Sequence, residues 1–277
     1  MTGPELTSTA NPRVKAVVRL RDRRERDATG QALVDGVREI GRAMDAGVGI
    51  VEVFASASLA TTSEARALLA RLTAAGHRTT EVSEPVLVRI AFGDRTDGIV
   101  VVIRMPRPTL GQVRLPSSPA PFIAVVEGVE KPGNLGAILR SADGAGLDAV
   151  VAADPRTDLA NPNVIRASLG TIFARPVVAA STVDTLAWLR RSGLTIVAAR
   201  VDGATDYAAQ DLRGPVAIVL GAEAEGLSPA WLAPDIRAVR LPMHGVADSL
   251  NVSATAAVLF YEARRQRDAG PASGEAP

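Results

Sequence analysis

Hydrophobic and polar residues along residues 31–105 follow the pattern of a small α/β domain. An amphipathic stretch places apolar side chains at Val34, Val37, Ile40 and Met44, and the apolar run GIVEVFAS follows it. A helical pattern over residues 62–75, the helix-like segment EPVLVRIAFG and the run GIVVVIRM come next. Apolar residues three to four apart indicate helices, whereas short runs rich in Val and Ile indicate strands.

A different pattern begins near residue 122. Continuous apolar runs recur, separated by helical patterns, and they read FIAVVEGV, AVVAA, PVVAA, LTIVAARV, VAIVLGAE and AVRLPM. Strands that are apolar on both faces are typical of a parallel sheet covered by helices on each side. The last predicted element is a helix from Ser249 to about Arg267, with apolar positions at Val252, Ala256, Leu259 and Phe260.

A stretch dense in Pro, residues 106–121, separates the two patterns and has no periodicity. Such composition is typical of a linker between domains. We therefore predict a small α/β domain over residues 1–105, a linker over 106–121, an α/β domain with a parallel sheet over 122–268 and a disordered tail over 269–277.

Composition excludes several classes of protein. Hydrophobic residues make up 47% and charged residues 22% of the 277, which is typical of a globular protein. The absence of Cys excludes disulfides, thiolate metal sites and a Cys nucleophile, and with two His we expect no metal site. No run approaches the roughly 18 apolar residues of a membrane span, and the N-terminus has no signal-peptide pattern. We expect a cytoplasmic protein without a membrane anchor.

Positive charge is concentrated near the N-terminus. Residues 11–26 contain seven basic side chains against two acidic ones, Asp22 and Glu25. Such a segment can contact nucleic-acid phosphates. A solvated helix face with its own ion pairs explains the same pattern, and charge alone does not separate the two interpretations.

Three loops that follow predicted strands carry the candidate chemistry, because ligands bind at the carboxyl ends of strands in open α/β sheets. The first contains Asn134, Gly136 and Arg140, the second Gly221, Glu223, Glu225 and Gly226, and the third Ser249, Asn251 and Ser253. Each has a structural explanation as well: a capping Asn with a surface Arg, a polar turn, and an N-capping Ser. The second loop does not match the G-x-G-x-x-G fingerprint of dinucleotide binding.

Taken in order, the three loops resemble the motifs of the SpoU (TrmH) branch of the SPOUT RNA methyltransferases. The first resembles N-x-G-x-x-x-R at Asn134, Gly136 and Arg140, and the second G-x-E-x-x-G at Gly221, Glu223 and Gly226. The third is similar to P-M-x-G-x-x-x-S-L-N-V-S, without a mismatch over residues 242–253. Three motifs in order over about 150 residues are far more specific than any one of them.

The N-terminal part resembles the L30e-like RNA-binding domain that many members of this family carry. That resemblance favours the phosphate-binding interpretation of the basic segment. We predict RNA contacts from Arg13, Lys15, Arg19, Arg23 and Arg24. Gln31-Ala32 departs from the family pattern, where a bulkier residue is frequent, without putting a function in doubt.

The resemblance implies a trefoil knot in the second domain and S-adenosylmethionine as the cofactor. It places the cofactor against eight residues: Ala199, Gly221, Glu223, Leu241, Met243, Ser249, Leu250 and Asn251. It implies no metal. The reaction would methylate a ribose 2′-hydroxyl of RNA, with ribosomal RNA as the first candidate substrate and transfer RNA as the alternative.

The candidate catalytic residues implied by the motifs are Asn134, Arg140, Glu223, Ser249 and Asn251. A guanidinium stays protonated and is a poor base, so we expect Arg140 to hold a phosphate and stabilise the developing alkoxide. Arg166 matches a family position near the substrate and is a further RNA-binding candidate. The family also implies a homodimer.

Two other functions fit parts of the same sequence. One is a non-catalytic RNA-binding or ribosome-assembly protein on a methyltransferase scaffold, and complete motifs argue against it. The other is a base-methylating SPOUT enzyme, whose motifs differ from those found here. Cofactor binding would separate the first of these from an enzyme.

Overall fold

The computed structural model describes residues 5–92, 97–117, 120–223 and 225–270. The chain forms two compact units, one of residues 1–106 with 158–174 and the other of residues 107–157 with 175–277. The segment 158–174 therefore packs with the first unit, although it lies between two strands of the second. The domain limits drawn from the sequence stay predictions. Of the expected tail over residues 269–277, residues 271–277 lie outside the described residues.

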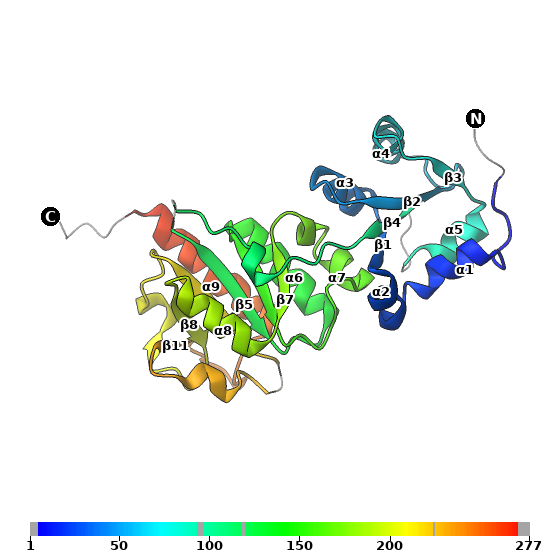
Figure 1. The fold of residues 1–277 in the computed structure, drawn as a ribbon. Coiled ribbons are helices and arrows are strands. Elements are labelled where there is room, and N and C mark those ends of the chain that lie inside the picture. Colours follow the sequence, from blue (N-terminus) through cyan, green and yellow to red (C-terminus); the bar gives the residue numbers. More distant parts are fainter. Residues whose placement is uncertain (1–4, 93–96, 118–119, 224, 271–277) are drawn as a thin grey trace. The chain divides into compact units, whose positions relative to one another are not determined.

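The first unit has a four-stranded sheet in the order β1-β4-β2-β3. Its strands are β1 (Gln31–Asp35), β2 (Ile50–Ala55), β3 (Thr79–Glu81) and β4 (Ile99–Arg104). Strand β4 pairs antiparallel with β1 and β2, and β3 runs parallel to β2. Figure 1 shows the helices of this unit around the sheet. They are α1 (Pro12–Arg19), α2 (Arg23–Thr29), α3 (Val37–Asp45), α4 (Ser63–Ala74), α5 (Glu84–Ile90) and, from the later segment, α7 (Pro162–Ala167).

Helices α1 and α5 pack on this sheet through apolar side chains. Val14 and Val17 of α1, Leu87 of α5 and Val102 of β4 belong to one buried cluster around Phe54. The side chain of Asn11 caps α1 by accepting a hydrogen bond from the backbone N–H of Arg13. The basic residues of α1 therefore stand on a helix with a fixed start and a buried face.

The second unit contains a seven-stranded sheet in the order β7-β6-β5-β10-β8-β11-β9, and every pairing in it is parallel. Its strands are β5 (Phe122–Glu127), β6 (Ala149–Ala153), β7 (Val177–Ala180), β8 (Thr195–Ala199), β9 (Thr205–Asp206), β10 (Val216–Leu220) and β11 (Ile236–Arg240). The predicted α/β class with a parallel sheet is confirmed. The two-residue strand β9 was not predicted, because it is too short to form a pattern.

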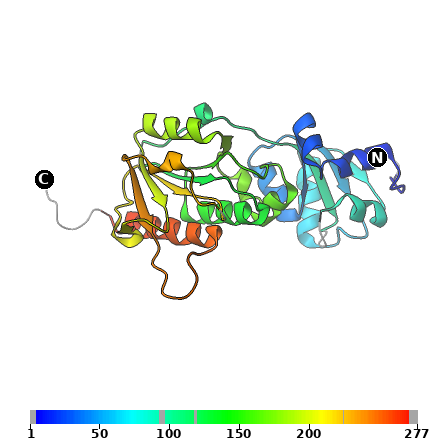
Figure 2. The same cartoon turned by 90° about the horizontal axis from the view of Figure 1, so that it is seen from below.

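Helices cover both faces of this sheet. Figure 2 shows α6 (Pro132–Ala145) and α9 (Val252–Asp268) side by side on one face and α8 (Thr182–Arg191) on the other. The Phe122 and Phe260 rings meet edge to face at 6.2 Å and join α9 to β5. Asn251 caps α9, with its side chain accepting from the backbone N–H of Ser253, so the helix begins later than the expected Ser249. Among the described residues, no helix is long and apolar enough to cross a membrane.

Candidate active site

A cavity of about 680 Å³ opens in the second unit at the carboxyl ends of β8 and β10. The loop after β11 and the first turn of α9 close its other side. All eight residues expected to contact a cofactor line this cavity: Ala199, Gly221, Glu223, Leu241, Met243, Ser249, Leu250 and Asn251. The cavity thus brings together residues from three separate parts of the chain.

The turn after β10 is tight, and two glycines make it so. Backbone hydrogen bonds join Ala222 and Gly226 in both directions, at 3.1 and 3.0 Å. Gly226 has a φ of +68°, which favours glycine. A Cβ on Gly221 would lie 2.3 Å from the carbonyl carbon of Gly226. The two ends of the turn therefore lie so close together that any side chain at residue 221 would force them apart.

The three predicted motif loops converge at this cavity. The side-chain amide of Asn251 donates a hydrogen bond to Oδ1 of Asn134 at 3.3 Å, and the amide of Asn134 donates to Oε1 of Glu223. Oδ1 of Asn251 in turn accepts from the N–H and hydroxyl of Ser253. Asn134 does not line the cavity itself, but it links the two motif residues that do.

Arg140 lies on α6, six residues after Asn134, and is exposed. Six residues of helix span about 9 Å along its axis. The Arg140 side chain does not line the cavity, and within the described part of the chain it has no hydrogen bond or ion pair. A guanidinium in this state can bind a substrate phosphate without first breaking an internal contact.

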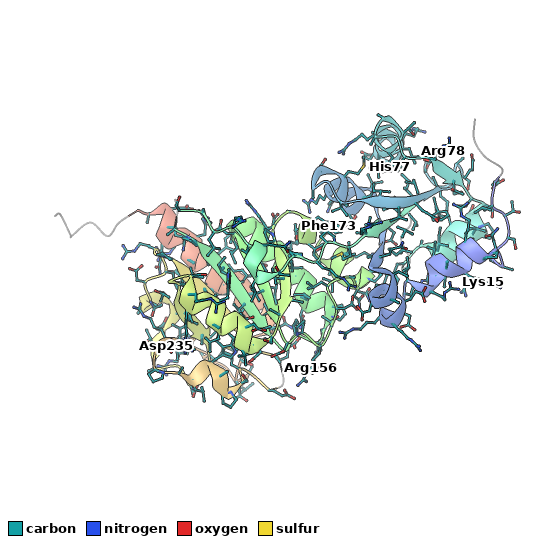
Figure 3. The ribbon with its side chains drawn as sticks, viewed as in Figure 1. Lys15, His77, Arg78, Arg156, Phe173 and Asp235 are labelled. Atoms are coloured by element: carbon teal, nitrogen blue, oxygen red, sulfur yellow. The ribbon has the colours of Figure 1, made fainter. Side chains whose placement is uncertain are left out.

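Four further charged residues line the cavity that were not predicted from the sequence, namely Lys131, Arg200, Asp202 and Asp248, and Glu225 of the second loop lines it as well. Arg200 grips Asp202 through two hydrogen bonds, of 2.9 and 2.5 Å, which lower the pKa of that carboxyl. Arg156, which is labelled in Figure 3, hydrogen bonds to Glu130 and, at 2.5 Å, to Glu225, and these bonds raise its pKa. Position after a buried strand was the available signal for Arg200, which follows β8 directly.

The basic residues predicted to bind RNA differ in whether their side chains already contact other residues of the first unit. Arg13 contacts Glu52 and Thr80, each at 3.2 Å, while Arg19 pairs with Glu25 and Arg23 with Asp27. Lys15 and Arg24 are exposed, and no side-chain partner is found for them in residues 5–92, 97–117, 120–223 and 225–270. Figure 3 shows Lys15 on α1.

Arg166 is engaged within the first unit. Its guanidinium contacts Oδ2 of Asp35 at 3.3 Å and donates to the carbonyl oxygen of Phe92. Asp35 also accepts from the backbone N–H of Phe92 at 2.8 Å. Burial raises the pKa of Asp35 to about 6, against the lowering effect of these two contacts. The structure thus gives Arg166 an internal partner, which the sequence did not indicate.

No group of His, Cys, Asp and Glu side chains that could hold a metal ion occurs among the described residues. His77 is partly exposed and His244 exposed. The polar side chains around the cavity carry an amide, carboxylates, hydroxyls, an ammonium group and a guanidinium group. Such groups can orient a ligand and stabilise charge.

Comparison with solved structures defines the class. A crystal structure of an RNA 2′-O ribose methyltransferase matches with a TM-score of 0.84 and 43% identity, over 95% of this chain and 99% of that one. The AviRb methyltransferase from Streptomyces viridochromogenes, solved with AdoMet, matches with a TM-score of 0.83 and 29% identity, over 94% and 100%. The fold is that of a SPOUT methyltransferase with a small N-terminal domain.

Sequence comparison then gives the family. The SpoU rRNA methylase family model matches residues 121–261, and an MRM3-like substrate-binding domain matches residues 11–101. A 23S rRNA (uridine(2479)-2′-O)-methyltransferase from Streptomyces viridochromogenes is 30% identical over 91% of this chain and 88% of its own length. The chain belongs to the SpoU rRNA methylase family.

Proposed function

We propose that this chain methylates a ribose 2′-hydroxyl in 23S ribosomal RNA. As a SpoU-family protein it is an S-adenosylmethionine-dependent RNA methyltransferase. The observation that carries the proposal is the linkage of Asn134, Glu223 and Asn251 beside one cavity. The ribosomal substrate rests on the names of the relatives, which include a 23S rRNA 2′-O-methyltransferase.

The cavity fits the cofactor in size and in the chemistry of its walls. Ligand cavities of roughly 300–1,000 Å³ hold molecules of this size, and this one measures about 680 Å³. The Gly221–Gly226 turn lets a ligand approach the backbone, and Glu223 places a carboxylate where a cationic ligand benefits from it. S-adenosylmethionine supplies an activated methyl group on a sulfonium.

The residues of this chain then position the RNA. Arg140 binds the phosphate next to the target ribose, because its planar fork matches phosphate geometry. It stabilises the negative charge that develops on the 2′-oxygen in the transition state. Asn134 has its amide orientation set by Glu223 and Asn251, so it presents a fixed dipole beside the cavity. Ser249 and Asn251 orient the cofactor and the ribose.

The first unit supplies contacts to the rest of the RNA. Lys15 and Arg24 are the principal phosphate-binding residues of the basic segment 11–26, since their charges have no internal partner among the described residues. Arg13, Arg19 and Arg23 contribute less, because each already has an acidic neighbour. A homodimer and a trefoil knot in the second unit complete the proposal, and both rest on the family resemblance.

The test is methylation of 23S ribosomal RNA by the purified chain with S-adenosylmethionine, followed by nuclease digestion and mass spectrometry of the nucleosides. One 2′-O-methylated nucleoside is the expected product. A methyl group on a base, or no cofactor binding in calorimetry, would contradict the proposal. The second result would favour a non-catalytic RNA-binding protein.

A further inference from the structure

Glu127, the last residue of β5, has a buried carboxylate that accepts three hydrogen bonds. Oε2 accepts from the backbone N–H of Ser228 at 2.7 Å. Oε1 accepts from the hydroxyl of Ser228 at 2.8 Å and from the hydroxyl of Thr182 at 2.7 Å. The residue is 7% exposed and does not line the cavity. None of the three family motifs includes it.

Ser228 stands at the exit of the Gly221–Gly226 turn. Between them lies Leu227, which lines the cavity. The entrance of the turn is fixed by the sheet, where Leu220 of β10 is in register with Val126 of β5. Its exit is fixed by two of the three bonds to Glu127. Strand β5 therefore holds both ends of the turn. Its pairing with β10 fixes the beginning, and the carboxylate of its last residue, Glu127, fixes the end.

The same two segments also lie close together one residue after Glu127. Gly128, directly after Glu127, has a φ of +64°, and a Cβ built on it would lie 3.4 Å from Cβ of Ala222 in the turn. The end of β5 thus lies close to the turn at Ala222 and holds it at Ser228. Thr182, the third donor, belongs instead to α8, on the opposite face of the sheet from α9.

We propose that Glu127 is a positioning residue that holds the Gly221–Gly226 turn in the conformation that binds S-adenosylmethionine. The inference rests on the proposed function, since it concerns the same cavity. A buried carboxylate keeps its donors because leaving it without them is costly, and hydrogen bonds to an ionised group are stronger than neutral ones. A turn held in advance does not have to be ordered when the cofactor binds.

The two hydroxyl donors to Oε1 provide a matched pair of variants. Ser228→Ala removes the donor on the turn, and Thr182→Val removes the donor on α8, each taking one hydrogen bond from the same oxygen atom. We expect Ser228→Ala to raise the Kd for S-adenosylmethionine about tenfold, and Thr182→Val to leave it within about twofold. Titration calorimetry measures both values, and thermal unfolding measures the loss of stability in each variant.

Ser228→Thr keeps a hydroxyl and should restore the wild-type Kd. Equal effects of Ser228→Ala and Thr182→Val on Kd would overturn the proposal, because they would show that Glu127 acts only on general stability. No change in Kd for Ser228→Ala would overturn it too. Wild-type protein that binds no S-adenosylmethionine would instead contradict the proposed function, so the two failures are distinguishable.

Discussion

The side-chain amide of Asn251 donates a hydrogen bond to Oδ1 of Asn134, a residue 117 positions earlier in the chain. The side-chain amide of Asn134 in turn donates a hydrogen bond to Glu223. Three motif loops are thereby joined by two side-chain hydrogen bonds. Because Asn134 donates through one atom and accepts through the other, neither a carboxylate nor an apolar side chain can replace it without breaking the chain of bonds.

Asn134→Asp should therefore abolish most activity. The substitution removes the donor to Glu223 and places two carboxylates beside each other. We expect kcat/KM to fall about 100-fold or more, equivalent to about 2.7 kcal/mol of transition-state stabilisation. Asn163→Asp, at an exposed position on α7, is the control and should remain near wild type. Equal activity of the two variants would contradict the role given to Asn134.

Gly221→Ala tests the tight turn. A Cβ there would lie 2.3 Å from the carbonyl carbon of Gly226, so the turn has to open. We expect loss of measurable S-adenosylmethionine binding in calorimetry. Gly214→Ala is the matched control, because a Cβ at Gly214 meets nothing within 4 Å and Gly214 lies outside the three motif loops. Tight cofactor binding by Gly221→Ala would show that the turn does not contact the cofactor.

Arg140→Lys tests whether phosphate binding needs the planar guanidinium group of Arg140 or only its positive charge. Lysine keeps the positive charge but loses the planar fork that binds a phosphate through two bonds. We expect single-turnover methylation to slow by about 100-fold while the Kd for S-adenosylmethionine stays unchanged, since Arg140 does not line the cavity. Arg191→Lys, exposed at the end of α8, serves as the control. A near wild-type rate would contradict the role of Arg140 in binding the phosphate through two bonds.

Lys15 and Arg24 should account for more RNA affinity than their neighbours. Replacing either by Ala should weaken RNA binding at every sequence and lower the slope of log affinity against log salt by about 1. Arg13→Ala should change that slope less, because Arg13 is paired with Glu52 at 3.2 Å. Filter binding over a range of salt concentrations measures all three. Identical slopes for the wild type and Lys15→Ala would remove Lys15 from the interface.

Asp35 makes the stability of the protein depend on pH. Its pKa rises from 3.8 to about 6 in the folded protein, chiefly because it is buried. Between those values the folded state binds more protons than the unfolded chain, so stability falls as the pH rises and levels off above about pH 6. The contribution is at most roughly 3 kcal/mol.

Asp35→Asn should remove this pH dependence, because an amide does not titrate in this range. The fold should tolerate the change, since the amide oxygen can still accept from the N–H of Phe92. Urea unfolding at pH 4.5 and pH 7 gives the free energies to compare. Asp45→Asn, at an exposed carboxylate, is the control and should keep the wild-type slope. A slope unchanged by Asp35→Asn would mean that another group titrates in this range.

Sequence patterns predicted the parallel sheet because its strands are continuous apolar runs. Five of the six predicted runs contain a whole strand, and the sixth, AVRLPM, contains the last three residues of β11. They did not predict that residues 158–174 pack with the first unit, since this follows from specific contacts. Arg26, for example, is 2% exposed and pairs with Asp158 at 2.6 Å, a relationship without any local pattern.

In the candidate site, too, residues with a sequence pattern were predicted, and residues placed by contacts distant in the chain were not. The motif residues were found because their identities and spacing match a family. Arg200 and Asp202 escaped prediction because their role as cavity walls depends on β8 lying beside β10 and β11. Arg166 was predicted to bind RNA, and its contact with Asp35 could not be foreseen, because the two residues are 131 positions apart in the chain.

A crystal structure with S-adenosylmethionine bound is the most direct test of the central claim that the three motif loops form one cofactor cavity. We predict the adenosyl group between the Gly221–Gly226 turn and residues 241–251, in contact with Ala199 and Met243. A cofactor bound elsewhere on the chain, or crystals that take up none at saturating concentration, would contradict that claim.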